Sequence, residues 1–146
     1  MTSTSDDPNS GRGPAEADAP GASDAAVFAD LEKNFGGALK TVLALYLETS
    51  NALSERLQDA MACAYWQEAV RVAIQIGDKA DALGFHPVAQ AAHAFAYAAY
   101  HDADDDDRPH RLRSDAQMVV LEYERFRLAL EMRFRDHIAP GLRSVA

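Results

Sequence analysis

Apolar residues recur at spacings of three and four along most of the chain that follows residue 24. This spacing places them on one face of an α-helix, so it predicts a helix wherever it continues over several turns. No stretch alternates apolar and polar residues across a run of β-branched side chains, which is the pattern typical of strands. The pattern therefore predicts an all-α protein.

Glycines and prolines divide this pattern into five expected helices. We expect a short helix over 25–34, then helices over 38–62, from Trp66 to a stop at Gly84, from His86-Pro87 onward, and over 114–137. Ser114 is the expected N-cap of the last helix. Short turns between long helices make neighbours antiparallel, so we expect an up-and-down antiparallel four-helix bundle with a short extra N-terminal helix.

The same pattern predicts which side chains form the core. The expected inward residues are Leu39, Val42, Leu43, Tyr46, Ser50, Leu53, Leu57, Ala60, Met61, Trp66, Ala69, Val70, Ala73, Ile76, Ala80, Leu83, Val88, Ala91, Ala92, Phe95, Ala99, Val119, Tyr123, Phe126, Leu130 and Phe134. The last helix carries a second apolar line, Met118, Leu121, Leu128 and Met132. We favour a wide core contact for this line, and homodimerisation is the alternative.

The N-terminal 24 residues have a different composition, rich in Pro, Gly, Ser and Asp and with hardly any large apolar side chain. Such a segment cannot bury enough surface to offset the entropy lost on ordering. We therefore expect a disordered tail over 1–24 and a single helical domain over 25–146.

Charge and cysteine content narrow the function classes. The chain of 146 residues has 23 acidic and 14 basic residues and a formal charge of −9, which disfavours nucleic acid and acidic membrane surfaces as partners. A single cysteine, Cys63, excludes an intrachain disulfide framework. No apolar run is long enough to span a bilayer, and the N-terminus lacks the pattern of a secretion signal. A cytoplasmic protein is expected.

The segment 39–84 combines a long helix, VLALYLETSNALSERLQDAM, with a short turn and the helix in AYWQEAVRVAIQIGDKADALGF. Trp66 is the aromatic of the turn, and Leu83-Gly84 is the terminating pair. In this order and spacing the segment resembles the histidine-containing phosphotransfer (HPt) domains of bacterial two-component signalling. Counting forward from Trp66 and backward from Leu83-Gly84 reaches one residue, Ile74, at the place of the family's phosphate-accepting histidine. The resemblance implies the helical bundle predicted above.

The residues that define phosphotransfer in this family are absent. The family pattern reads His-x-x-Lys-Gly, and the aligned positions hold Ile74, Gly77 and Asp78. The resemblance implies that the histidine would attack the phosphoryl group of a receiver aspartate, but isoleucine has no lone pair. Asp78 adds bulk and negative charge against a receiver pocket that is itself carboxylate-lined, which weakens docking in the usual pose. We therefore expect no enzymatic phosphotransfer at this site.

The resemblance also implies a place for partner binding. Receivers and histidine kinases dock on the face of the family's histidine helix, so we expect a binding patch centred on an exposed Ile74 and rimmed by Arg71, Gln75, Asp78 and Asp81. An ordinary exposed apolar residue is the alternative interpretation of Ile74.

Among the five histidines, His93 is the best candidate for a displaced phosphoacceptor. It lies beside the inward stripe of the fourth helix, without a lysine within one turn, so a partly buried structural histidine is the favoured interpretation. His86 and His93 lack an identifiable third metal ligand. No metal or cofactor is expected.

The acidic run at 102–107 does not fit a calcium loop. An EF-hand beginning at Asp102 needs glycine where Asp107 stands and glutamate where Arg113 stands. A solvated acidic loop followed by a basic cluster is the expected structure.

The sequence thus favours a non-catalytic module that binds a response-regulator receiver domain or a histidine kinase. Two alternatives stay open: an active phosphotransfer protein that uses His93, and an unrelated structural helical bundle.

Overall fold

The computed structural model describes residues 20–135, with side chains from Asp24 onward. The regular structure in this range consists of α2 (Pro20–Phe35), the short 3-10 helix η1 (Gly36–Ala38), α3 (Leu39–Ala62), α4 (Trp66–Ala82), α5 (His86–His101) and α6 (Arg108–Arg133). The prediction of an all-α helical bundle is confirmed. Most of the expected tail, and the expected end of the last helix at His137, lie outside the described residues.

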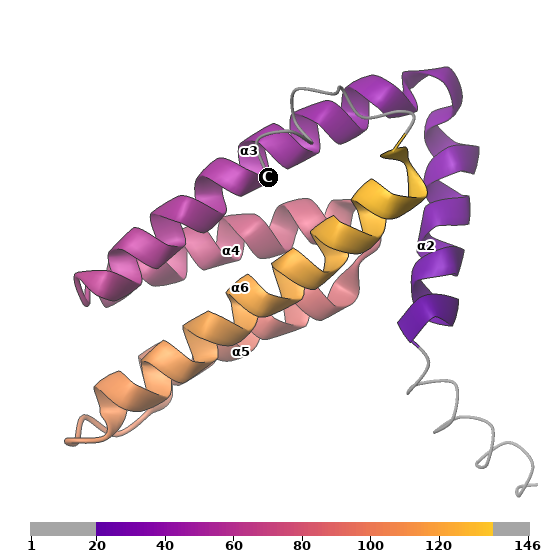
Figure 1. The fold of residues 1–146 in the computed structure, drawn as a ribbon. Coiled ribbons are helices and arrows are strands. Elements are labelled where there is room, and N and C mark those ends of the chain that lie inside the picture. Colours follow the sequence, from indigo (N-terminus) through magenta and orange to yellow (C-terminus); the bar gives the residue numbers. More distant parts are fainter. Residues whose placement is uncertain (1–19, 136–146) are drawn as a thin grey trace, which may run out of the picture.

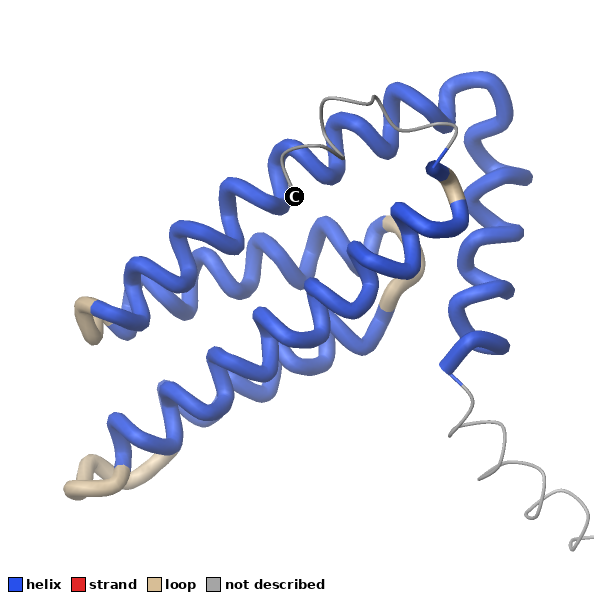
Figure 2. The backbone as a smooth tube through the Cα atoms, viewed as in Figure 1, coloured by secondary structure: helices blue, strands red, loops and turns tan. Residues whose placement is uncertain are grey.

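Helices α3 to α6 form the bundle, and α2 crosses one of its ends (Figure 1). The loops lie at the ends of the bundle and are short (Figure 2), so consecutive helices run antiparallel, as expected. The α3–α4 and α4–α5 turns use the same backbone device. Tyr65 N–H donates to the Ala60 carbonyl, and Phe85 N–H donates to the Ala80 carbonyl, with Ala64 and Gly84 in the left-handed conformation.

Two helices begin earlier than expected. Helix α2 begins at Pro20, rather than at Ala25. Helix α6 begins at Arg108, so Ser114 lies inside the helix and the prediction that it is the N-cap is wrong. The reason is Pro109, which occupies the first turn of the helix, where the backbone N–H has no intrahelical partner to lose.

The acidic loop before α6 interacts with the helix that follows it. Arg111 donates hydrogen bonds to Asp102 at 3.2 Å and to Asp105 at 3.0 Å. The hydrogen bond from Arg111 holds the pKa of Asp105 below its usual range. The carboxylates also stand near the N-terminus of α6, where the helix dipole favours negative charge. These contacts give the loop a structural role.

The core contains most of the expected side chains, and its largest rings gather where α2 meets the bundle. Phe28 of α2 stacks on Phe126 of α6 at 6.0 Å and meets Phe134 edge-on at 5.5 Å. Phe85, in the α4–α5 turn, also stacks on Phe126, with ring centroids 3.9 Å apart. Because Phe28 is 4% exposed, α2 belongs to the core of the domain.

The second apolar line of α6 is not part of the core. Its four side chains are all exposed: Met118 49%, Leu121 52%, Leu128 53% and Met132 71%. The expectation of a wide core contact is therefore wrong. The buried side chains of α6 lie on the other side of the helix, and that side alone faces its neighbours in the described chain.

None of the described helices combines the length and the apolar character needed to cross a membrane.

Candidate binding face on helix α4

Helix α4 has a sharply divided surface. Small and branched apolar residues cover the side that packs against α3 and α5: Ala69, Val70, Val72, Ala73, Ile76, Gly77 and Ala80. At 100° per residue, Arg71, Gln75 and Asp78 lie within about 60° of one another on the opposite side. Arg71 and Asp78 are exposed and Gln75 is partly buried. The helix thus presents a polar outer face.

Ile74 lies at the edge of this outer face. Its side chain is partly buried and packs against the core, so the prediction of an exposed Ile74 is wrong. The reason is the next turn of the helix, where Gly77 lets α5 come close. A Cβ atom on Gly77 would lie 2.8 Å from the Ala92 Cβ and 3.2 Å from the Ala89 Cα. This close approach covers part of Ile74.

Gly77 also changes the comparison with the HPt pattern. In the expected alignment it stands at the position of the family's lysine, yet here it is buried in the α4–α5 contact, where a side chain would force the two helices to shift. Asp78, at the position of the family's glycine, is exposed. In the alignment counted from Trp66 and from Leu83-Gly84, the place of the family's motif therefore has no lysine and has an exposed carboxylate, that of Asp78.

The N-terminal end of the outer face is held by ion pairs. Glu68 accepts hydrogen bonds from Arg71 of the same helix and from Arg56 of α3, the latter at 2.9 Å. Hydrogen bonds from Arg71 and then Arg56 lower the pKa of Glu68, so this carboxylate stays ionised. A shallow hollow beside Arg71 is lined by Tyr65 and Trp66 among others. Arg71 is thus oriented in advance of any contact with a partner.

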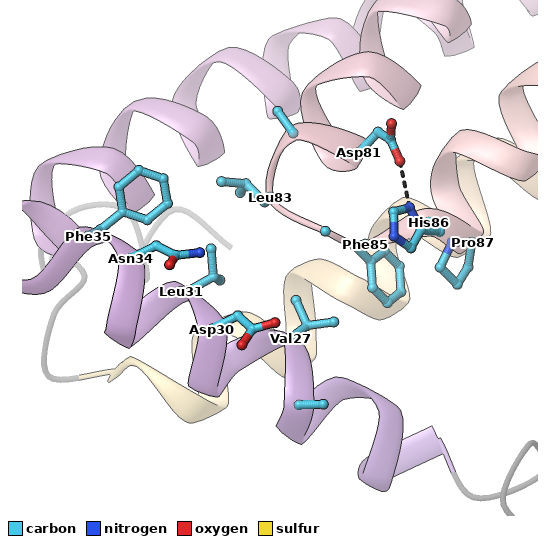
Figure 3. A pocket seen from close by; sticks show the side chains of 13 residues that line it. Val27, Asp30, Leu31, Asn34, Phe35, Asp81, Leu83, Phe85, His86 and Pro87 are labelled. Carbon is cyan, nitrogen blue, oxygen red and sulfur yellow. Dashed lines mark hydrogen bonds and ion pairs between the residues drawn. The ribbon is translucent and has the colours of Figure 1, made fainter.

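The C-terminal end of the outer face opens into a pocket beneath α2 (Figure 3). The pocket has a volume of about 540 Å³ and is lined mainly by apolar side chains of α2 and of the α4–α5 turn, with Asp30 and Asp81 at its polar edge. The His86 Nδ1 lies 2.6 Å from the Asp81 Oδ1, and the carboxylate accepts this hydrogen bond.

The Asp81–His86 pair is a feature that sequence reasoning missed. The Asp81 carboxylate fixes the orientation of the imidazole and leaves Nε2 free to meet a ligand or proton donor. Both groups are exposed, at 68% for the His86 side chain and 52% for Asp81. The sequence could have predicted this pair, because Asp81 and His86 flank Leu83-Gly84, where the helix ends, and a tight turn brings such flanking residues together.

His93 lies on the same side of the bundle as Ile74. Gly77 faces Ala89 and Ala92, and the two helices are antiparallel. Because the helices are antiparallel, the residue one turn before Gly77 on α4 lies level with the residues one turn further along α5. Ile74 and His93 are therefore at the same height along the α4–α5 contact. His93 is exposed, so the expectation of a partly buried structural histidine is wrong.

No three His, Cys, Asp or Glu side chains gather as metal ligands would within the described part of the chain. His86 is hydrogen-bonded to Asp81, and His93 lies about two turns further along α5.

Comparisons with protein-family models, with curated proteins and with solved structures find no match for this chain. The resemblance to HPt domains therefore stays an expectation from the sequence of 39–84.

Proposed function

We propose that this chain is a non-catalytic binding module of two-component signalling, which engages a receiver domain or a histidine kinase in the cytoplasm through the outer face of α4. The face consists of Arg71, Ile74, Gln75, Asp78 and Asp81. The observation that carries the proposal is the position of Ile74: the register of the HPt pattern places it where a histidine would stand, on the border of an exposed polar helix face.

The geometry of the face supports binding over catalysis. Arg71 and Asp81 are about 15 Å apart along the helix, a length suited to one edge of a small protein interface. Ile74 supplies an apolar contact at the border of the face, beside the charged groups of Arg71, Asp78 and Asp81, so the face combines apolar and charged contacts. Isoleucine cannot accept phosphate, so the module would modulate or block phosphate flow.

The charge of the face selects the partner surface. Asp78 and Asp81 are exposed carboxylates, whereas Arg71 is already paired with Glu68. The C-terminal half of the face is therefore acidic and complements a basic surface. A partner that docks here would avoid placing its own carboxylates against Asp78.

Isothermal titration calorimetry with purified receiver and kinase domains from the source organism tests this proposal. Asp78→Arg should weaken, by about tenfold or more, the binding of a partner that meets the α4 face with a basic surface, which is a different pose from the usual one that sets receiver carboxylates against Asp78. Asp104→Arg makes the same change of charge in the exposed acidic loop and serves as the control. Equal loss in both variants would show that net charge, not the α4 face, governs binding.

A second candidate function is phosphate acceptance by His93. The observation that favours it is the exposure of His93 at the height of Ile74. Incubation with a phosphorylated receiver would then place acid-labile phosphate on the wild-type chain and none on His93→Ala. His101→Ala, which removes another exposed histidine of α5, is the control. If neither a receiver nor a kinase binds or transfers phosphate, the unrelated structural bundle is the better account.

A further inference from the structure

Helix α6 is apolar on two opposite sides. Val119, Tyr123, Phe126 and Leu130 are fully buried on the side that faces the bundle. Met118, Leu121, Leu128 and Met132, called the α6 stripe below, are exposed on the other side. At 100° per residue the members of the α6 stripe lie within about 80° of one another and directly away from the buried side. A surface helix of a monomer normally carries polar residues there.

The charged side chains beside the α6 stripe are already paired within the chain. Arg125 lies within the arc of the stripe, where it bonds Asp24 of α2 at 3.1 Å and lies over the Phe85 ring at 4.8 Å. On one edge of the stripe, Glu124 and Glu131 accept hydrogen bonds from Arg127 at 2.6 Å and 2.9 Å. A partner that covers the stripe would therefore meet edges whose charges are largely compensated, which reduces the cost of removing water.

The order of residue types in the α6 stripe is nearly symmetric about Arg125. A methionine stands seven residues before Arg125 and another seven after it, with a leucine inside each of them. A two-fold axis near Arg125 would bring Met118 of one copy against Met132 of the other, and Leu121 against Leu128. An isologous interface requires such a self-complementary surface.

We propose that the α6 stripe is a homodimer interface, in which two copies of the chain pack α6 against α6 in antiparallel orientation. The stripe is about 21 Å long, and its four side chains fall short of the area that a permanent dimer buries. The dimer is therefore reversible and forms as concentration rises. This inference does not depend on the proposed function, because the stripe points away from the bundle that contains α4.

Sedimentation equilibrium of the full chain tests the interface. From about 1 µM to about 1 mM the apparent mass should rise from 15.9 kDa towards twice that value. Leu128→Glu should keep the chain monomeric over this range. Leu45→Glu is the control, because Leu45 is 63% exposed on α3, outside the stripe, and its variant should dimerise as the wild type does. Far-UV circular dichroism checks that each variant keeps its helices.

A charge exchange tests the antiparallel register. Leu121→Glu alone and Leu128→Arg alone should each abolish the dimer, whereas the double variant Leu121→Glu/Leu128→Arg should restore it, since each glutamate then faces an arginine of the other copy. A parallel pairing would oppose like charges and give no restoration, which would overturn the register.

Two results would overturn the proposal as a whole. One is a wild-type chain that stays monomeric over the whole range of concentration. The other is a dimer that Leu128→Glu leaves intact. A third result would point to another occupant of the stripe. If the wild type is monomeric, and Leu128→Glu lowers the melting temperature of the full chain but not that of a chain ending at Arg135, then the segment 136–146 of the same chain covers the stripe.

Discussion

Gly77 shows how a single residue sets the geometry of the candidate site. The absence of its side chain allows α5 to approach α4, and this approach partly buries Ile74. The sequence alone indicated that Ile74 lies near the outer face. It could not indicate the partial burial, because that depends on the distance between two helices, which small residues on both of them decide together.

Gly77→Ala should destabilise the fold by about 1–3 kcal/mol, although alanine is the better helix former, because the new methyl group would lie 2.8 Å from the Ala92 Cβ. Urea denaturation measures the change. Gly37→Ala is the matched control, since no atom lies within 4 Å of the added Cβ there. Equal stability of wild type and Gly77→Ala would contradict the close packing of α4 on α5.

The buried tyrosines predict how stability depends on pH. Burial raises the pKa of Tyr46, and burial together with the nearby Tyr46 raises the pKa of Tyr123, so both are above the ordinary value of about 10. The unfolded chain then loses these protons first. Stability is present below about pH 10 and falls as pH rises above it.

Thermal melts between neutral and strongly alkaline pH measure this loss. The double variant Tyr46→Phe/Tyr123→Phe should lose less of its stability above about pH 10 than the wild type does. Tyr65→Phe is the control, because Tyr65 is exposed and should leave the profile unchanged. Identical profiles for all three proteins would show that these phenols do not govern alkaline unfolding.

Element boundaries could be predicted where glycine or a tight turn ends a helix, as at Gly84 and before Trp66. The start of α5 at His86-Pro87 was also predicted correctly, whereas the start of α6 at Arg108-Pro109 was predicted wrongly. Pro109 ends nothing, and α6 takes in the basic cluster that follows the acidic loop. The two apolar lines of α6 could both be found from spacing, but spacing cannot tell which of two faces is covered by the rest of the fold.

Ser114→Ala separates the two accounts of α6. Inside the helix, as the structure has it, the change should leave stability unchanged or raise it by about 0.5 kcal/mol, because alanine is the better helix former. A loss of about 1 kcal/mol on urea denaturation would instead mark a broken N-cap and contradict the longer helix.

We expect α2 and the bundle to unfold as one cooperative unit. Phe28 of α2 is inserted among the rings of α6, and Asp24 is paired with Arg125. Helix α4 begins with Trp66, at the end of the bundle opposite α2 (Figure 1), so Trp66 fluorescence measures unfolding far from α2.

Phe28→Ala should therefore cost about 3–5 kcal/mol and shift the unfolding transition seen by Trp66 fluorescence and by far-UV circular dichroism together. Tyr97→Ala, which truncates an exposed ring of α5, is the control and should cost little. A Trp66 transition that does not move would mean that α2 unfolds separately from the bundle.

The most direct test of the central claim is a nuclear magnetic resonance footprint. The labelled chain is titrated with each receiver and kinase domain of the source organism, and the amides that shift on binding are mapped onto the helices. Shifts should be concentrated in α4 between Arg71 and Ala82, and Asp78→Arg should abolish them. Shifts confined to α2 or α6, or the absence of shifts with every such domain, would show that the α4 face is not the binding site.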